Sequence, residues 1–400
     1  MTLLLFIGLS GSCVNPATGT GDSPRRNVVS LDPARNKPPP DLKPSGTSPE
    51  LKPLPPPAEP SGEKAAVPQP TFPEAGALPE KYALLFQAVR SDPPPPKIVH
   101  DTHYFISNEG AHHVWREALE NLGGALAGPG TDQLYILAAW QKPSVLFALD
   151  FDETIQYVHR LYGLAFAHAR TPDEFISLWK YGRTKPSRIK ALISSEIVDP
   201  ALRKKLVLVL EKCNSDVLQR FRIVKEYYRT LKQTCYLTDL EQYNTVRNLW
   251  LWGRVFPIRG DLTAEVTMQD LARALDKAGV PLRALYLSNA EQYFKYTPTY
   301  RRNIVVQPFD DRSIVLRTQS HTRDVIRDGN GYRFNLQGGK NFARWLRLSN
   351  VVDVKELMEK RTRAATPGIS VLDQEPPTNA KPPRIAPVGD GYAFPGRHPI

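Results

Sequence analysis

Cysteine is scarce in this sequence, and several short motifs that mark common enzyme classes are missing. The 400 residues include three cysteines, and no C-x-x-C pair occurs. The chain also has no G-x-S-x-G, H-E-x-x-H or P-loop motif. Serine hydrolase, zinc protease and nucleoside triphosphatase functions therefore lack support. Cys213 and Cys235 lie in helical sequence, where buried thiols are common, and their spacing leaves open whether they pair.

Proline is rare in the middle of the chain and dense toward both ends. Of the 38 prolines, 21 lie within residues 1–100 and nine within residues 101–363. A proline-dense segment with few aromatic residues cannot bury enough apolar surface to offset its ordering entropy. We therefore expect a disordered linker over residues 14–96 and a disordered tail over residues 364–400. Residues 97–363 are enough for one well-buried domain.

Cationic side chains outnumber anionic ones but are not gathered in one arm. The formal net charge is +11. Many cations recur at helical spacing within residues 200–232, which is typical of a solvated helix face. A nucleic-acid surface would need aromatic or groove-reading side chains among these cations, so no nucleic-acid partner is expected. Weak attraction to anionic envelope polymers is an alternative role.

A short apolar segment at residues 3–9 leads through small residues to Cys13. The segment is too short to span a bilayer. An apolar run, small residues, a cysteine and a long polar linker follow one another as in a bacterial lipoprotein signal, although Ser10 replaces the usual leucine. We expect residues 1–13 to be such a signal, with the protein anchored in the cell envelope through a lipid on Cys13. The alternative is a cytoplasmic protein whose apolar N-terminus has no role.

Strand and helix patterns alternate along residues 97–363. Apolar runs typical of buried parallel strands occupy residues 121–127, 145–149, 255–258 and 282–287. Helical patterns separate them, and residues 200–232 form part of a helical insertion. Residues 303–306 and 313–317 flank a turn and predict a C-terminal antiparallel hairpin. The pattern predicts an α/β fold of three layers, in which helices cover both faces of a mostly parallel sheet.

Several polar residues and glycines follow the predicted strands. Ligands of open parallel sheets bind beyond the carboxyl ends of the strands, where the strand order switches. Asp150 ends the second strand, about 20 residues after a glycine-containing turn, where a ribose-binding carboxylate belongs. The candidate binding residues are Gly128, Gly130, Asp132, Gln133, Asp150, Asp261, Asn289 and Glu291.

Each candidate also has a purely structural interpretation. The two glycines could form only a turn, and Asn289 and Glu291 could satisfy backbone groups at a strand end. Asp152 and Thr267 are expected to cap the helices that follow them rather than to bind a ligand.

Histidines gather near the start of the predicted domain. His100, His103, His112 and His113 lie close to Asp101 and Glu109 in the sequence. Their spacing matches no metal-ligand signature, and adjacent histidines rarely direct both rings to one point. No metal site is therefore expected.

Three sequence blocks resemble a family of uncharacterised bacterial proteins whose fold is similar to that of S-adenosylmethionine-dependent methyltransferases. They are residues 105–109, residues 128–177 and residues 256–293, and the resemblance extends over most of residues 104–318. It implies a Rossmann-like, methyltransferase-like fold with a cleft that could hold S-adenosylmethionine beside the candidate residues. The activity of the family is unassigned, so the resemblance names no catalytic residue.

Two departures from the family pattern bear on function. Leu134 follows Gln133 where the family usually has asparagine, and no arginine closely follows Asp150. We expect an envelope-tethered, monomeric lipoprotein whose domain is a non-catalytic module for a small ligand or an envelope partner. The alternative is an S-adenosylmethionine-dependent methyltransferase, in which Asp150 would bind the ribose and Asp261 or Asn289 would position the acceptor.

Overall fold

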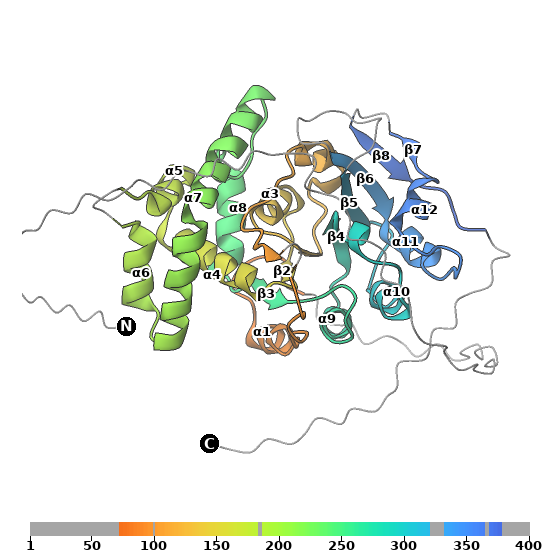
Figure 1. The fold of residues 1–400 in the computed structure, drawn as a ribbon, viewed down its shortest axis with the longest axis horizontal. Coiled ribbons are helices and arrows are strands. Elements are labelled where there is room, and N and C mark those ends of the chain that lie inside the picture. The colour runs from red at the N-terminus through yellow and green to blue at the C-terminus, as the bar shows by residue number, and fades with distance from the viewer. Residues whose placement is uncertain (1–71, 99–100, 183–185, 321–331, 365–367, 378–400) are drawn as a thin grey trace, which may run out of the picture. The chain divides into compact units, whose positions relative to one another are not determined.

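The computed structural model describes residues 72–98, 101–182, 186–320, 332–364 and 368–377. Cys13, His100 and most of the predicted linker lie outside these residues. The described residues contain an eight-stranded sheet in the order β3-β2-β1-β4-β5-β6-β8-β7 (Figure 1). Its strands are β1 Ala125–Gly128, β2 Val145–Asp150, β3 Val255–Arg259, β4 Leu282–Ser288, β5 Ile314–Ser320, β6 Tyr332–Gly338, β7 Thr362–Arg363 and β8 Ile369–Leu372.

The sheet is mostly parallel, as the alternating pattern predicts. Strands β3, β2, β1, β4 and β5 run parallel to one another, and β6 is antiparallel to β5. Strand β8 is parallel to β6, and β7 is antiparallel to β8. The chain proceeds from β1 outward to β2 and β3 and then continues on the other side of β1 with β4 and β5. The strand order therefore switches between β1 and β4.

The antiparallel hairpin is formed by β5 and β6, so the predicted strand at residues 313–317 is confirmed as part of it, whereas the predicted strand at residues 303–306 is wrong. Residues 303–305, expected as its first strand, belong to helix α10 (Pro298–Val305). This helix begins at proline, and the hydroxyl of its N-cap Thr297 accepts the Tyr300 N–H at 3.1 Å. Proline at the first helical position and a hydroxyl cap both favour helix over strand there.

Helices cover both faces of the sheet. Leu146 and Ala148 of β2 belong to one apolar core, which continues into α3 to α8. Val145 and Phe147 belong to the other core, which includes residues of α1, α9, α10, α11 and α12. The helices have these bounds: α1 Glu80–Gln87, η3 His112–Trp115, α2 Arg116–Leu119, α3 Asp132–Gln141, α4 Glu153–His168, α5 Pro172–Trp179, α6 Arg188–Glu196, α7 Pro200–Thr230, α8 Leu240–Leu251, α9 Thr267–Ala278, η4 Ala290–Tyr293, α11 Gly339–Trp345 and α12 Val354–Met358.

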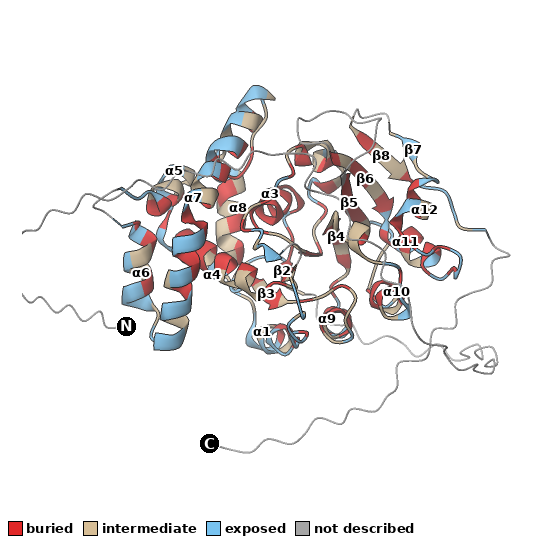
Figure 2. Ribbon diagram, in the orientation of Figure 1, coloured by how far each residue is buried: buried red, intermediate tan, exposed pale blue. Residues whose placement is uncertain are grey.

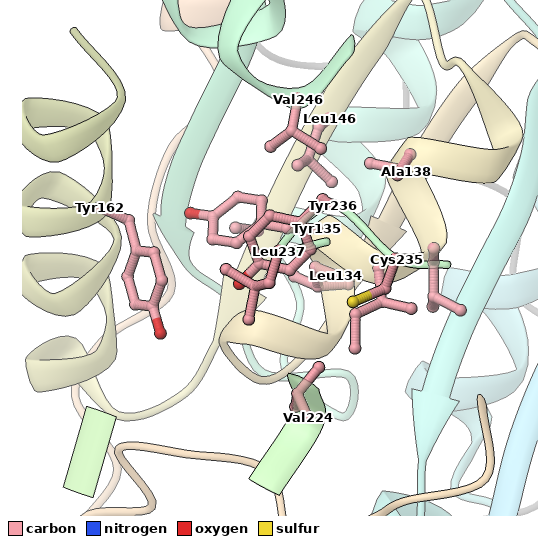
Figure 3. Packing of buried hydrophobic residues seen from close by; sticks show 14 of the residues in the cluster. Leu134, Tyr135, Ala138, Leu146, Tyr162, Val224, Cys235, Tyr236, Leu237 and Val246 are labelled. Atoms are coloured by element: carbon pink, nitrogen blue, oxygen red, sulfur yellow. The ribbon is translucent and has the colours of Figure 1, made fainter. Parts of the chain in front are cut away.

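Helices α5 to α8 lie between α4 and β3 in the chain. Helix α7 begins at Pro200 after the N-cap Asp199, and one of its sides is exposed along much of its length (Figure 2). Its buried side meets α3 and α4, and Figure 3 shows Val224 of α7 in the same cluster as Leu134 and Tyr162. Both Cys213 and Cys235 are buried, unpaired thiols.

The folded region begins before the boundary expected at residue 97. Helix α1 lies within the proline-rich stretch, and its Tyr82 and Phe86 are buried in the core. Phe86 packs edge-on against Phe147 of the sheet, with ring centroids 5.4 Å apart. The proline-rich composition concealed a short amphipathic helix that is stable because it packs on the sheet.

Asp92 ties this N-terminal segment to the start of α9. Its fully buried carboxylate accepts N–H groups of Asp261, Val266 and Thr267 at 2.9–3.1 Å. Thr267 was expected to cap this helix, but it is the first helical residue, and its hydroxyl donates to the carbonyl oxygens of Arg90 and Arg259. A carboxylate from a distant segment therefore performs the capping role.

The C-terminal end of the fold also extends past the predicted boundary at residue 363. Strand β8 pairs with β6 over four residues of each strand. Trp345 of α11 donates its indole N–H to the carbonyl oxygen of Gln374 at 2.8 Å. The first residues of the expected tail therefore belong to the folded unit.

Candidate ligand site at the carboxyl edge of the sheet

Residues 101–111 cross the carboxyl ends of β2, β1, β4 and β5, and we call them the entry strap. His103 Nδ1 lies 2.6 Å from Oδ2 of Asp152, just after β2. The Ser107 N–H donates to Asp132 at 3.3 Å, at the start of the helix after β1. Glu109 accepts the hydroxyl of Ser288, at the end of β4, at 2.5 Å. The strap therefore lies along the edge where open α/β sheets bind their ligands.

The turn after β1 is fixed by contacts to its backbone. Gly130 has φ +97°, and a Cβ there would lie 1.7 Å from Nε2 of Gln133, so glycine is required. The Gly130 N–H donates to Oδ2 of Asp150 at 3.3 Å, and the Thr131 N–H donates to Oε1 of Gln133 at 2.9 Å. The side chain of Gln133 therefore stabilises the turn through a hydrogen bond to its backbone.

Gly128 serves the packing of the sheet. A Cβ at this position would lie 2.4 Å from the carbonyl oxygen of Tyr286 on the neighbouring strand β4. The requirement for glycine at residue 128 thus follows from its contact with β4, and a ligand is not needed to explain it.

Asp150 ends β2 and is partly exposed. Its Oδ1 accepts the Asp152 N–H at 2.9 Å, and its Oδ2 accepts the Gly130 N–H. Burial raises the pKa of Asp150 to about 7, and the nearby Asp152 carboxylate also raises it, against the two backbone hydrogen bonds. Both carboxylate oxygens are thus already engaged by the protein.

The ring of His159 on α4 is hydrogen bonded to the backbone of the glycine turn. Its Nε2 lies 2.8 Å from the carbonyl oxygen of Gly130, and its Nδ1 lies 2.7 Å from the hydroxyl of Tyr135. Because a carbonyl oxygen can only accept, Nε2 carries the proton and Nδ1 accepts from the tyrosine. Burial lowers the pKa of His159 to about 4, so the imidazole is neutral at pH 7.

Two of the predicted carboxylates form buried ion pairs. Oδ2 of Asp132 lies 2.6 Å from Nε of Arg220 on α7, and both side chains are buried. Oε2 of Glu291 lies 2.6 Å from Nε of Arg317 on β5. The other oxygen of Glu291 accepts hydroxyls of Tyr296 and Tyr300. These contacts assign both carboxylates a role in the interior of the fold.

Asp261 and Asn289 lie at strand ends with local partners. Oδ1 of Asp261 accepts both the N–H and the hydroxyl of Thr263 at 2.7 Å. Asn289 follows Ser288, whose hydroxyl lies 3.5 Å from the Asn289 Oδ1. Asp152 caps α4 as predicted, because its Oδ1 accepts the Thr154 N–H at 2.9 Å.

Glu109 organises the ends of β4 and β5. Its two oxygens accept the hydroxyls of Tyr286, Ser288 and Thr318 at 2.5–2.6 Å. Burial opposes its ionisation, but hydrogen bonds from its neighbours and the nearby His112 lower the pKa of Glu109 below the ordinary value. Ser288 adopts φ +51°, an unusual backbone conformation at the end of a strand.

The histidines in the entry strap and directly after it each have different neighbours. His103 pairs with Asp152, His112 is fully buried against Trp115 and Phe334, and His113 Nδ1 lies 3.2 Å from the Tyr227 hydroxyl. Across the described ranges, no three histidine, cysteine, aspartate or glutamate side chains are placed to hold a metal ion. In the same part of the chain, no helix has both the length and the apolarity needed to cross a bilayer.

The structure therefore brings Gly130, Gln133 and Asp150 together and places Asp132 and Glu291 in buried ion pairs. The individual roles of His103, His159 and Glu109 were not predicted from the sequence. The resemblance did include Glu109 in its first block, but the hydrogen-bond partners of all three side chains lie 24 to 209 positions away in the chain. Leu134, taken from the sequence as a change in the cleft, is fully buried in the apolar core (Figure 3).

Comparison with known proteins identifies the family of this chain but assigns it no activity. A search of curated proteins finds no match. The family profile described as a domain of unknown function, DUF7790, matches residues 104–373, more than half of the chain. This range begins within the entry strap and ends just after β8. The chain belongs to the DUF7790 family.

Proposed function

We propose that this protein is an envelope-tethered lipoprotein whose α/β domain is a non-catalytic module for a small ligand or an envelope partner. The observation that supports a non-catalytic role is the hydrogen bonding of the Asp150 carboxylate. Each of its oxygens accepts a backbone N–H of the chain itself, from Gly130 or Asp152. Each bond occupies one acceptor site of its oxygen, so fewer sites remain for the hydroxyls of a ribose, which lowers the expected affinity for a nucleoside.

The other acidic candidates support the same proposal. Asp132 and Glu291 are bound to Arg220 and Arg317, so neither is available to a ligand without breaking a buried ion pair. The entry strap also covers the carboxyl edge, with His103 held by Asp152. A ligand would meet mainly strap side chains and the exposed part of the edge.

The second candidate function is methyl transfer from S-adenosylmethionine on a Rossmann-like fold. The strand order β3-β2-β1-β4-β5, with a glycine turn after β1 and a carboxylate at the end of β2, favours it. The burial of Leu134 also removes one of the two sequence arguments against a cofactor. The missing arginine after Asp150 and the proposed export of the protein still favour the binding module, because S-adenosylmethionine is a cytosolic metabolite.

Calorimetric titration with S-adenosylmethionine and S-adenosylhomocysteine tests the choice between these functions. We expect the wild-type protein to bind neither with a Kd below about 1 mM, near −4 kcal/mol. Asp150→Ala is the informative variant, and Asp311→Ala is its control, because the Asp311 carboxylate is exposed and pairs with Lys340. Micromolar binding that Asp150→Ala abolishes and Asp311→Ala retains would establish the cofactor site instead.

The tether is tested separately on the full chain. We expect metabolic labelling with a palmitate analogue to mark the wild-type protein and not Cys13→Ala, since Cys13 is the proposed lipidation site. Cys213→Ala is the matched control, because this thiol is buried and its pKa is raised by burial to about 12. Equal labelling of the wild type and Cys13→Ala would exclude anchoring through Cys13.

A further inference from the structure

The two ends of the entry strap are held to the sheet differently. At the inner end, the buried carboxylate of Glu109 accepts three hydroxyls from β4 and β5 at 2.5–2.6 Å. At the outer end, residues 101–104 are mostly exposed, and the side chain of His103 is 32% exposed. Short hydrogen bonds to a buried carboxylate are the stronger contacts, so the inner end is the anchor and the outer end opens more easily.

The part of the strap before Glu109 makes one short and one long hydrogen bond to the sheet edge. Nδ1 of His103 lies 2.6 Å from Oδ2 of Asp152, and it carries the proton because an ionised carboxylate can only accept. The Ser107 N–H donates to Asp132 at 3.3 Å, a longer and weaker bond. The His103 bond is therefore the stronger of the two.

Asp152 does not depend on the strap for its own position. Its Oδ1 accepts the Thr154 N–H at 2.9 Å and caps α4, and its N–H donates to Oδ1 of Asp150 at 2.9 Å. The bond to His103 uses the other oxygen, Oδ2. The strap can therefore leave Asp152 while the end of β2 and the start of α4 stay folded.

We propose that residues 101–107 form a lid over the carboxyl edge and that the hydrogen bond between His103 and Asp152 is its latch. The lid opens about the anchor at Glu109 and uncovers Asp150 with the glycine turn after β1. This inference rests on the proposed binding role of the carboxyl edge and adds a regulation of that site. A ligand reaches the edge from the open state, so its apparent affinity falls with the fraction of open molecules.

Amide hydrogen exchange at Ser107, measured on the full chain, tests the latch. This N–H is bonded to Asp132 while the lid is closed, so its exchange rate reports the open fraction. We expect His103→Ala to speed the exchange by about tenfold, because a hydrogen bond to a carboxylate is lost. Exchange at Thr154 should stay unchanged, since its acceptor remains in place.

His168→Ala is the matched control for His103→Ala. The side chain of His168 is 34% exposed, and its Nε2 lies 2.5 Å from Oε1 of Glu196. This second pair of a histidine with a carboxylate has similar exposure but involves the last residue of α4, whereas Asp152 caps the first turn. His168→Ala should therefore leave exchange at Ser107 as it is in the wild type.

Asp152→Asn breaks the latch from the other side. The asparagine oxygen still caps α4, but a neutral amide accepts the His103 proton less strongly than a carboxylate does. Exchange at Ser107 should again be faster. The double variant His103→Ala, Asp152→Asn should exchange no faster than the faster single variant, because the two residues act as one pair. Additive effects would overturn the latch.

Two further results would overturn the lid. One is unchanged exchange at Ser107 in both single variants, and the other is equal acceleration at Ser107 and Thr154, which would mean loss of stability throughout the domain. These measurements need no added ligand, so their failure leaves the proposed function in place. Micromolar binding of S-adenosylmethionine through Asp150 would overturn the proposed function instead and leave the exchange results standing.

Discussion

Asp132 and Arg220 form a buried ion pair that joins the helix after β1 to the long helix α7. The carboxylate oxygen lies 2.6 Å from Nε, and both side chains are almost fully excluded from solvent. Asp132 also accepts the Ser107 N–H of the entry strap. One carboxylate therefore links three segments that are far apart in the sequence, and the geometry of the carboxyl edge depends on it.

Removing one member of this pair should be strongly destabilising. Arg220→Met leaves the Asp132 carboxylate buried without its cation, so we expect a loss of about 3–5 kcal/mol in the free energy of unfolding. The double variant Asp132→Leu, Arg220→Met should recover much of the loss. Urea denaturation measures both. Lys225→Met, which breaks the exposed pair with Asp173, is the control and should cost less than about 1 kcal/mol.

Two buried tyrosines should respond oppositely to loss of the hydroxyl. The hydroxyl of Tyr162 is buried and has no hydrogen-bond partner, so Tyr162→Phe should leave stability unchanged or raise it by about 1 kcal/mol. Tyr135→Phe removes the bond to His159 and leaves a buried nitrogen unpaired, at a cost of about 1–3 kcal/mol. Equal thermal stability of the two variants would contradict these assignments.

His159 and Asp150 should give opposite pH dependences of stability. The pKa of His159, about 4, lies below its ordinary 6.5, so between these values the unfolded chain binds the extra proton and acid destabilises the fold. The pKa of Asp150, about 7, lies above its ordinary 3.8, so the folded protein holds the extra proton and rising pH destabilises it. In the wild type, the two effects partly cancel between about pH 4 and about pH 6.5.

Asp150→Asn removes one of these opposing titrations. We expect the variant to lose more stability than the wild type on acidification from about pH 6.5 to about pH 4.5, by up to ~3 kcal/mol from His159. Unfolding in urea at a series of pH values measures the slope. The same slope for both proteins would mean that Asp150 titrates near its ordinary value.

Residues before the expected domain boundary should be needed for stability. A chain that begins at residue 97 lacks Phe86 and the Asp92 carboxylate that caps α9, so it should unfold at a lower temperature than one beginning at residue 72. Asp92→Ala alone should cost about 1–2 kcal/mol or more, since three N–H groups lose their acceptor.

Limited proteolysis should leave a fragment close to residues 72–377. A stable fragment that starts near residue 97 would contradict this.

The sequence by itself determined the features that depend on neighbouring residues. Period and composition located β2 and β4, and Asp152 caps α4 as predicted. These features could be predicted because hydrophobic pattern and capping act over a few residues.

The tertiary structure decided the features that depend on residues far apart. The partners of Asp132 and His103 lie 88 and 49 positions away, and no local pattern specifies such pairs. Helix α1 is short and flanked by prolines, so only its packing on the sheet reveals that it is folded. Comparison with the family pattern placed Leu134 in the cleft. Its side chain is instead buried, because the direction of that side chain depends on how α3 packs. Burial and pairing follow from the assembled fold, because the free energy of a buried charge or apolar side chain depends on every segment that surrounds it.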